Sequence, residues 1–598
     1  MSLSQTQDAQ KSLMPGHMTP AGLQLTSTLL FRRLFVALLN LGVYALLLLW
    51  LASIFAPGGW TPLRAGIFIA FAIAAPWSVL GVCNSLIGLC LQHLHPRGLQ
   101  AAAPFAAVGE EVVPLRKRTA ILMTIRNEAP ARAFARLRAM QQSVNATGQG
   151  ASFDWFVLSD TTDAAIAAAE EAAFAQWRTD SGPVAWRQYY RRRDTNEGYK
   201  AGNIRDFCER WGAAYEFMLP LDADSLMDGD TILRLVRICE AYPKLGILQS
   251  LVVGAPSRSA FARIFQFGMR HGMRCYTLGA SWWTGDCGPF WGHNAVVRIA
   301  PFAKDCVLPT LRDGAHVMSH DQLEAALMRR AGYEVRVLPV ECGSFEENPP
   351  TLLEFTRRDL RWCEGNMQYW YLLGLPGLKP MSRFQMVWAI SMFIGVPAWT
   401  LIIALVALMP AFGDVIAPEE TGSAIGLYLV FIGLYLAPKL TGLLDVVMQR
   451  GGLARYGGGL RFAASACVEI LFSFLIGAAT TLRTSLFLGA LAVGQTSGWT
   501  AQNRDAHALS WTTAARGMWP QTLFGLAIFG LGLVYAPMLL VWSIPLTIGY
   551  LLAIPFAVVT AAPALGAWFV RHGLCPAPEE LDPPAVFQSL SDLQAKLG

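Results

Sequence analysis

Two carboxylates, Asp222 and Asp224, stand one residue apart at the end of the stretch YEFMLPLDAD, residues 215–224. The part before them, 215–221, is apolar or aromatic apart from Glu216 and predicts a buried strand. In an open α/β sheet the ligand crevice lies beyond the carboxyl ends of the strands, so both carboxylates would face a substrate. A D-x-D pair there suits Mg²⁺ bridging to a diphosphate, because Mg²⁺ takes one or two protein carboxylates together with phosphate oxygens. Taken alone, the pair fits an exposed strand-end turn equally well.

Polar side chains also follow the two candidate strands that come first in this part of the chain. Thr124 lies at the end of the strand predicted over 119–125, and Asn127 and Glu128 come directly after it. Asp160 follows the strand predicted over 155–159. A single carboxylate at a strand end is usually a helix cap. Three strands that each deliver an acid to one crevice indicate a site instead.

Two further segments carry residues that suit phosphate or proton chemistry. Lys200-Ala-Gly-Asn203 opens a predicted helix, where backbone N–H groups and a lysine can meet a phosphate, although a solvated lysine and a glycine turn explain it equally well. Asp321 stands in the first turn of a helix predicted to run to Arg330. It is either an acid favoured by the helix dipole or a general base for a hydroxyl nucleophile.

An arginine- and aromatic-rich segment follows. Arg358, Arg361 and Trp362 share one face of a predicted helix. The two guanidinium groups would bind membrane lipid phosphate or neutralise a leaving diphosphate, with the indole as a platform for a sugar. Upstream, four aromatic residues lie close together and would grip an acceptor sugar or form a core: Trp282, Trp283, Phe290 and Trp291.

The composition indicates a membrane protein with a soluble insert. Of 598 residues, 54% are hydrophobic and 15% charged, and the mean hydropathy is +0.37, which is too apolar for a wholly soluble protein. The net charge of +5 is small and no basic arm stands out, so no nucleic acid partner is expected. The eleven cysteines show no C-x-x-C pair or zinc spacing and favour free thiols.

Apolar runs divide the chain into membrane and soluble parts. Between 98 and 350 short apolar runs alternate with helical patterns, which predicts an α/β domain with a mainly parallel, Rossmann-like sheet. Pairs of transmembrane helices are predicted within 31–92, 384–448 and 521–570, each long enough to cross about 30 Å of hydrocarbon. The remaining parts are a disordered tail at 1–30, interfacial helices at 351–380, a segment at 463–520 and a cytosolic tail at 571–598, unstructured after Cys575.

Charges flanking the spans predict the orientation. Arg32 and Arg33 precede the first span and Arg97 follows the second, so the soluble domain is expected in the cytoplasm. Residues 463–494 are long and apolar but contain Glu469 and Arg483. We expect an in-plane or re-entrant helix there, with an ordinary span as the alternative.

The combination of motifs carries a family resemblance. Asp160, Asp222-Ala-Asp224, Asp321 and the segment 358–362, in this order between membrane spans, resemble the D, D-x-D, D, Q/R-x-x-R-W series of processive inverting glycosyltransferases of the cellulose and hyaluronan synthase type. The segments ILMTIRNE, DWFVLSDTTD, YYRRRDTNEGYKAGN, FMLPLDADSLM, FWGHNAVVR, SHDQ and RRDLRWCEGNMQY are similar to the glucans biosynthesis glucosyltransferase H family, which makes osmoregulated periplasmic glucans. The resemblance covers most of residues 118–370.

The resemblance implies a GT-A fold, UDP-glucose as donor, Mg²⁺ or Mn²⁺, and a growing glucan extruded through the protein's own spans in the bacterial inner membrane. The glucan backbone is typically β-(1→2)-linked in this family, and acyl carrier protein and periplasmic glucan-processing proteins are partners that only the family suggests. The residues expected in each role are, for the donor, Thr124, Asn127, Glu128, Asp160, Lys200, Asn203, Asp222, Arg358 and Arg361; for the metal, Asp222 and Asp224; for the base, Asp321; and for the acceptor, Trp291, His293 and Trp362.

A later segment completes the resemblance. Trp499, Gln502 and Arg504 look like the gating-loop segment that closes over the nucleotide in cellulose synthase. Arg358 stands where cellulose synthases have glutamine, and the cytosolic tail is short for the family.

Two other functions are compatible with parts of the sequence. A non-processive transferase that forms a lipid-linked sugar would need the D-x-D site but no arginine and tryptophan platform. A channel or transporter with a nucleotide-sensing domain would leave Asp321 without a role.

Overall fold

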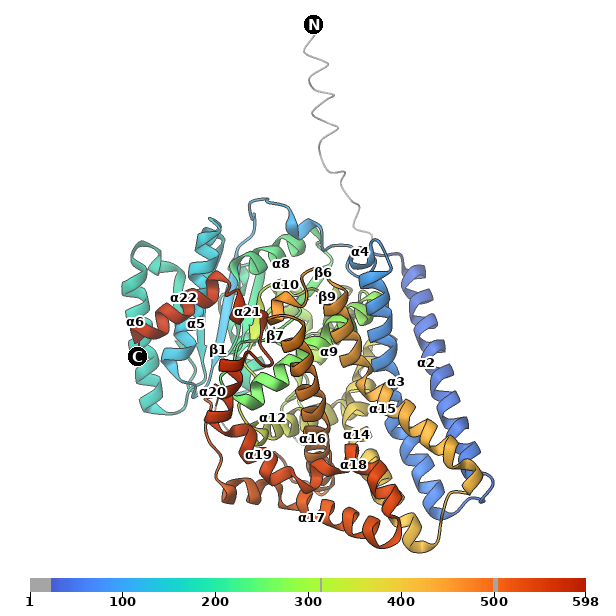
Figure 1. Cartoon of the computed structure of the whole chain (residues 1–598). Coiled ribbons are helices and arrows are strands. Elements are labelled where there is room, and N and C mark those ends of the chain that lie inside the picture. The colour runs from blue at the N-terminus through green and yellow to red at the C-terminus, as the bar shows by residue number, and fades with distance from the viewer. Residues whose placement is uncertain (1–22, 312–313, 498–503, 598) are drawn as a thin grey trace.

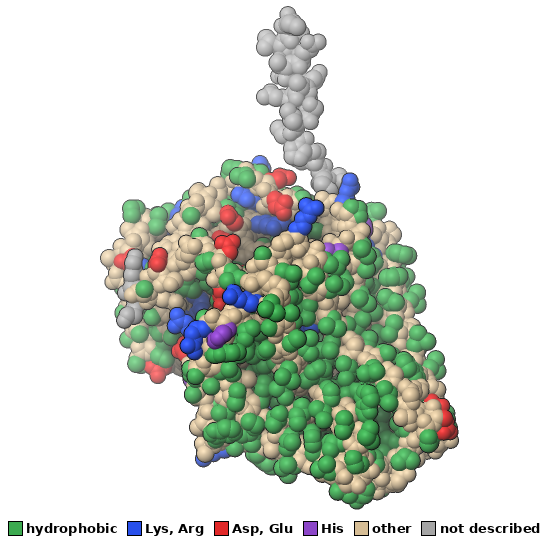
Figure 2. Space-filling model, viewed as in Figure 1, with side chains coloured by type: hydrophobic (Ala, Val, Ile, Leu, Met, Phe, Trp, Pro, Cys, Tyr) green, Lys and Arg blue, Asp and Glu red, His purple; other side chains and the backbone are tan. Residues whose placement is uncertain are grey.

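The protein consists of an α/β part and a bundle of long apolar helices (Figure 1). Figure 1 shows the computed structural model, which describes residues 23–311, 314–497 and 504–597. In Figure 2 hydrophobic side chains cover the helical part, whereas charged side chains gather over the α/β part. An exposed apolar surface of this extent is typical of contact with lipid. The expected fold class, an α/β domain inserted between membrane helices, is confirmed.

The main sheet has seven strands in the order β3-β2-β1-β4-β8-β6-β9. Its neighbouring strands are parallel except at β8, which is antiparallel to β4 and β6. A second sheet has the order β5-β10-β7. The strands are β1 (Thr119–Ile125), β2 (Phe153–Ser159), β3 (Gln188–Arg192), β4 (Phe217–Leu221), β5 (Leu226–Met227), β6 (Leu245–Ser250), β7 (Val253–Gly254), β8 (Ala295–Arg298), β9 (Glu334–Leu338) and β10 (Ser344–Glu346).

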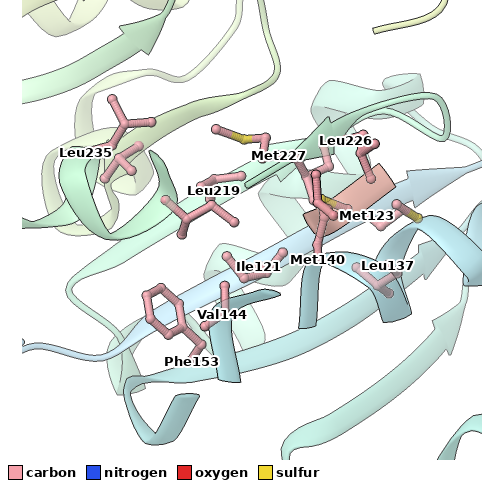
Figure 3. Packing of buried hydrophobic residues seen from close by; sticks show 14 of the residues in the cluster. Ile121, Met123, Leu137, Met140, Val144, Phe153, Leu219, Leu226, Met227 and Leu235 are labelled. Carbon is pink, nitrogen blue, oxygen red and sulfur yellow. The ribbon is translucent and has the colours of Figure 1, made fainter. Parts of the chain in front are cut away.

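Helices cover both faces of the main sheet, which is why its strands read as unbroken apolar runs. Alternate residues of β1 face opposite clusters. Ile121 packs with Met140 and Val144 of α5 on one face (Figure 3), and Leu122 belongs to the cluster on the other face. The helices of this part are α4 (Gly98–Ala102), α5 (Pro130–Ala146), α6 (Ala164–Ser181), α7 (Tyr199–Arg210), α8 (Gly229–Ala241), α9 (Ala260–Thr284), α10 (Ile299–Asp305), α11 (His320–Arg330), α12 (Leu352–Met367) and α13 (Tyr369–Leu372).

Six helices among the described residues are long and apolar enough to cross a membrane, and the bent pair α18–α19 would make a seventh span. The helices of the membrane part are α2 (Thr26–Phe55), α3 (Pro62–His93), α14 (Pro380–Leu408), α15 (Thr421–Met448), α16 (Gly459–Ala492), α17 (Trp511–Tyr535), α18 (Pro537–Leu551), α19 (Ala553–Ala561) and α20 (Pro563–His572). The sequence predicts the two spans within 521–570 over 522–542 and 544–569, and the helices of the structure have other bounds. Pro537 begins a new helix inside the first, and the second is divided among three helices, with a 60° bend between α18 and α19.

Helix α9 connects the sheet to the membrane helices. It crosses α3 and α15 so closely that a Cβ on Gly88 or Gly442 would lie 1.8 Å from a backbone carbonyl oxygen of α9. Only glycine permits this approach of two helix backbones. The contact fixes the α/β part against the bundle.

Helix α16 is unbroken over its 34 residues, so the re-entrant form considered from the sequence is not seen. Both ends of α16 contact elements of the α/β part. Near its start, Glu469 lies against Gly268 of α9, and near its end Thr484 donates a hydrogen bond of 3.3 Å to Asp359 of α12.

The C-terminal residues are ordered, contrary to the unstructured tail predicted after Cys575. They form α21 (Pro578–Leu581) and α22 (Ala585–Leu597), and α22 packs on α5 (Figure 1). Val586, Leu590 and Leu593 are buried in the core of the sheet part. Ahead of them, Glu579 accepts hydrogen bonds of 2.7 and 2.8 Å from the buried Arg270 of α9.

Candidate active site

The carboxyl ends of β1, β2 and β4 meet at one edge of the sheet, as predicted. Thr124 donates a hydrogen bond of 3.1 Å to the Leu221 carbonyl, which ties β1 to β4. Asn127 has a left-handed φ of 51°, and its side-chain oxygen accepts hydrogen bonds from the backbone N–H groups of Thr162 and Asp163 at 3.0 and 3.1 Å. Asn127 therefore holds the loops after β1 and β2 together.

Asp160 forms a two-pronged ion pair with Arg193, with both N–O distances 2.7 Å. Arg193 is the residue directly after β3, and nothing in the local sequence marks it as part of the site. Asn203 is completely buried, donates to the Leu158 carbonyl at 3.1 Å and accepts from Arg191 at 2.7 Å. Asn203 therefore holds the ends of β2 and β3 in place, whereas the family resemblance predicts that it contacts the donor.

Asp222 pairs with Lys200, so the structure brings these two predicted residues together. Its backbone N–H donates to the Ser225 hydroxyl at 3.1 Å, and that hydroxyl lies 3.5 Å from His293 Nδ1. Burial would raise the pKa of Asp222, but the neighbouring Lys200, together with His293, holds it at about 2. Asp222 is thus ionised at neutral pH.

Asp224 pairs with Arg504, which also lies 3.4 Å from Glu128. Burial alone would lower the pKa of Arg504, but the two carboxylates raise it well above its ordinary value. The pKa of Glu128 is raised, chiefly by burial. The segment expected to resemble a gating loop therefore reaches the D-x-D pair through Arg504. Trp499 and Gln502 lie outside the described residues.

Asp321 lies in the first turn of α11, beside Gly292. Gly292 has a left-handed φ of 79°, and a Cβ there would sit 3.4 Å from the Asp321 Cβ. Trp291 precedes this glycine and its backbone N–H donates to Gln249 at 2.9 Å, while His293 follows it. Burial raises the pKa of Asp321 above its usual value. The segment 291–293 therefore connects the predicted base with the D-x-D turn.

Arg358 and Trp362 lie on α12, and Arg358 is near Asp224 of the D-x-D pair. The Arg358 guanidinium stacks 4.6 Å from the centre of the Trp362 ring, and the Trp362 side chain is 49% exposed. The pKa of Arg358 is lowered by burial, against the opposing charges of Glu346 and Asp224. Arg361 is on the same helix, and its pKa is lowered by burial and by Arg358.

Glu346, at the end of β10, is a further acid near the D-x-D pair that the sequence did not reveal. It lies 3.5 Å from His293 Nε2, and burial raises its pKa. Its strand has only three residues and gives little periodic signal.

Three of the four clustered aromatic residues are packing residues. Trp283 is buried and donates a hydrogen bond of 2.9 Å to Asn84 of α3, Trp282 packs edge-on against Phe35, and Phe290 is buried. Trp291 alone lies next to the predicted base. Of that cluster, only Trp291 remains a candidate for acceptor binding.

The acidic pair fits a divalent cation that shares its coordination with a substrate. Asp222 and Asp224 each face a cationic side chain, Lys200 and Arg504. Within the described ranges no group of three or more His, Cys, Asp or Glu side chains is placed to hold a metal by itself. One or two carboxylates completed by phosphate oxygens are what Mg²⁺ prefers.

Comparison with known proteins gives consistent matches. The family described as Glycosyl transferase family group 2 matches residues 217–437, from β4 to α15. Proteins named glucans biosynthesis glucosyltransferase H match almost the whole chain. That of Caulobacter vibrioides is 38% identical over 90% of this chain and 84% of its own, that of Xanthomonas campestris 36% over 91% and 86%, and that of Vibrio cholerae 35% over 93% and 78%. Among solved structures, a mannosyltransferase of Pyrobaculum calidifontis in complex with GDP-Man and Mn²⁺ aligns with 61% of this chain and 98% of its own, at 15% identity and a TM-score of 0.37.

Proposed function

The chain belongs to the glucans biosynthesis glucosyltransferase H family, and we propose that it polymerises glucose from UDP-glucose into a glucan that it passes across the inner membrane. The matches make it a glycosyltransferase of glucan synthesis with apolar helices of membrane-spanning length. The donor, the processive mode, the β-(1→2) linkage and the translocation belong to the proposal. One observation carries it: Lys200 pairs with Asp222 and Arg504 pairs with Asp224, while Asp321 lies near enough to feel the charge of Lys200 and Arg358 near enough to feel that of Asp224.

Catalysis would use these side chains in fixed roles. The carboxylate of Asp321 takes the proton of an acceptor hydroxyl, whose oxygen attacks the anomeric carbon of glucose as the bond from that carbon to the diphosphate breaks. Attack from the face opposite the leaving group inverts the configuration. Lys200, Arg358 and Arg361 stabilise the negative charge that develops on the diphosphate. The exposed Trp362 ring offers its face to the sugar at the end of the glucan.

We assign a divalent cation, Mg²⁺ or Mn²⁺, to Asp224 and Asp222. When bound, it would neutralise diphosphate charge as a Lewis acid. Arg504 pairs with the same carboxylate through Oδ2 of Asp224.

The proposed orientation places the α/β part in the cytoplasm. Arg33, at the start of α2, pairs with Asp286 of that part at 2.6 Å, so the positive flank of the first span lies on its side of the bundle. Asp414, in the acidic loop between α14 and α15, pairs with Arg64 at the other end of α3. Helix α16 is proposed to lie along the cytoplasmic face, because it contacts α9 through Glu469 and α12 through Thr484.

Purified protein in vesicles, supplied with UDP-glucose and Mg²⁺, is expected to make polymeric glucan. A product of a single glucose on lipid would favour the alternative, a non-processive transferase that forms a lipid-linked sugar. Absence of any glucose transfer would remove the proposal. Acyl carrier protein and periplasmic glucan-processing proteins are tested by adding them to this assay.

A further inference from the structure

A cavity of about 540 Å³ adjoins the active site at Arg504 and belongs to none of the roles assigned above. It lies between the first turn of α5, the loop 255–258, the residues that follow β10, and Gln594 of α22. Its volume falls within the range of about 300–1,000 Å³ that small-molecule sites occupy. Neither Asp321 nor Trp362 lines it, so it is separate from the proposed acceptor position.

The lining of this cavity contains buried polar groups without partners. Asn348 is 6% exposed, and neither the oxygen nor the nitrogen of its amide has a hydrogen-bond partner within the described part of the chain. The same holds for one carboxylate oxygen of Glu347 and for Nε of Arg504. Buried polar atoms of native proteins are almost always hydrogen-bonded to protein, water or ligand. These three residues therefore need a partner that both donates and accepts.

The lining holds three arginines and two acids, and most of these side chains form ion pairs. Arg132 lies 2.5 Å from Glu347 and also pairs with Asp505. Arg504 forms ion pairs with Asp224 and Glu128. A ligand with neutral hydroxyl groups leaves these pairs intact and can also accept a hydrogen bond from Arg258, an exposed arginine of the lining that belongs to none of them. Hydroxyl groups are neutral and act as donor and acceptor at once. Alanine and proline side chains, such as Ala131 and Pro256, provide an apolar wall for the C–H face of a sugar ring.

We propose that this cavity is a second carbohydrate site, which binds a stretch of β-linked glucan beside the donor site. The identity of the ligand as a glucan rests on the proposed function. Because Arg504 and Glu347 belong to the cavity lining and Arg504 also contacts the D-x-D pair, an occupied cavity would hold the segment that begins at Arg504 in place.

The experiment measures binding of a linear β-(1→2)-linked glucose trisaccharide to the full chain in lipid nanodiscs by saturation-transfer NMR. Ala131→Trp and Gln594→Trp place an indole into the cavity from two different walls, and both positions are exposed, so the fold should tolerate them. Ala165→Trp is the matched control, since Ala165 is an exposed residue in the first turn of another helix, α6. UDP binding to each variant reports that it is folded.

We expect trisaccharide affinity to fall at least tenfold in both cavity variants and to stay unchanged in Ala165→Trp, with UDP affinity unchanged in all three. Equal trisaccharide binding in wild type and both cavity variants, or no trisaccharide binding to wild type, would overturn the site. Displacement of the trisaccharide by UDP would also overturn it, because the cavity would then be part of the nucleotide site. Glucan synthesis from UDP-glucose is measured in a separate assay. Loss of synthesis by the wild-type protein would contradict the proposed function, whereas loss of trisaccharide binding alone would contradict the second site.

Discussion

Replacing Asp321 by asparagine separates a catalytic base from a structural helix acid. Asn keeps the size of the side chain and an acceptor oxygen but cannot take a proton. Nucleotide affinity should be nearly unchanged, because the residues expected to bind the nucleotide lie on other elements: Asp160 after β2, Lys200 in α7 and Asp222 after β4. Turnover should fall about 10²- to 10⁴-fold, or roughly 3 to 5 kcal/mol of barrier, which is the usual effect of losing a positioned base.

The structure supplies a control for the alternative role. Asp163 caps α6 by accepting hydrogen bonds from the Ala165 and Ile166 N–H groups at 2.9 and 3.0 Å, and it is exposed. Asp163→Asn should leave the rate per folded molecule unchanged and cost well under about 1 kcal/mol of stability, since asparagine is an equally good cap. If Asp321 were only a first-turn acid, its replacement would likewise cost about 0.3 to 1 kcal/mol of stability and little rate.

The pH dependence provides a second test of the same residue. Burial raises the pKa of Asp321, so the acidic limb of kcat should lie above the usual aspartate pKa of about 3.9, with the rate rising as pH increases and the carboxyl loses its proton. The assay is glucose incorporation per folded, UDP-binding molecule across pH. An Asp321→Asn rate within about threefold of wild type would remove this residue from the mechanism.

Three further predictions concern the metal, the topology and the C-terminal segment. Asp224→Ala should abolish glucose transfer, and wild type should lose activity in excess EDTA; full turnover in EDTA contradicts the metal assignment. In a variant without other cysteines, Val493→Cys at the end of α16 should react with an impermeant thiol reagent only from the cytoplasmic side. Val415→Cys should react only from the periplasmic side, and both positions are exposed. Labelling of Val493→Cys from the periplasm would contradict the placement of α16. Glu579→Gln should lower the free energy of unfolding by about 1 to 3 kcal/mol in thermal melts, because it weakens a buried charge-assisted pair with Arg270. Glu209→Gln, which weakens the exposed pair with Arg205, should cost less than about 1 kcal/mol, and equal losses for both would contradict this reasoning.

The parts of the fold that the sequence predicted correctly have strong local signals. Strand β1 begins and ends at the predicted residues, because seven apolar or small residues buried on both faces are followed directly by polar ones. Helix boundaries in the membrane part are difficult to predict, because hydropathy alone does not show where an apolar run is divided into separate helices. Pro537 and Pro563 each begin a new helix inside runs that read as continuous spans.

The sequence predicts the site residues that follow strand ends, but it does not predict the residues that distant segments bring to them. Arg193 and Glu346 face Asp160 and His293, but nothing in their local sequence marks this. The C-terminal helix did have a signal. Val586, Leu590 and Leu593 recur at helical spacing on one face, but the surrounding prolines and acids read as a loop.

The packing of α22 on α5 sets an order for the biosynthesis of this protein. Helix α5 belongs to the first part of the sheet to leave the ribosome, and the helix that covers it follows every helix of the bundle in the chain. At about 5–20 residues per second, synthesis separates the two by tens of seconds or more, during which the helices that cross the membrane must enter it. Until then the apolar surface of α5 that meets Val586, Leu590 and Leu593 is open to solvent or to a chaperone. Completion of the catalytic domain thereby follows insertion of the membrane bundle, so a chain stalled before residue 585 would carry its strands and its spans but an unfinished core.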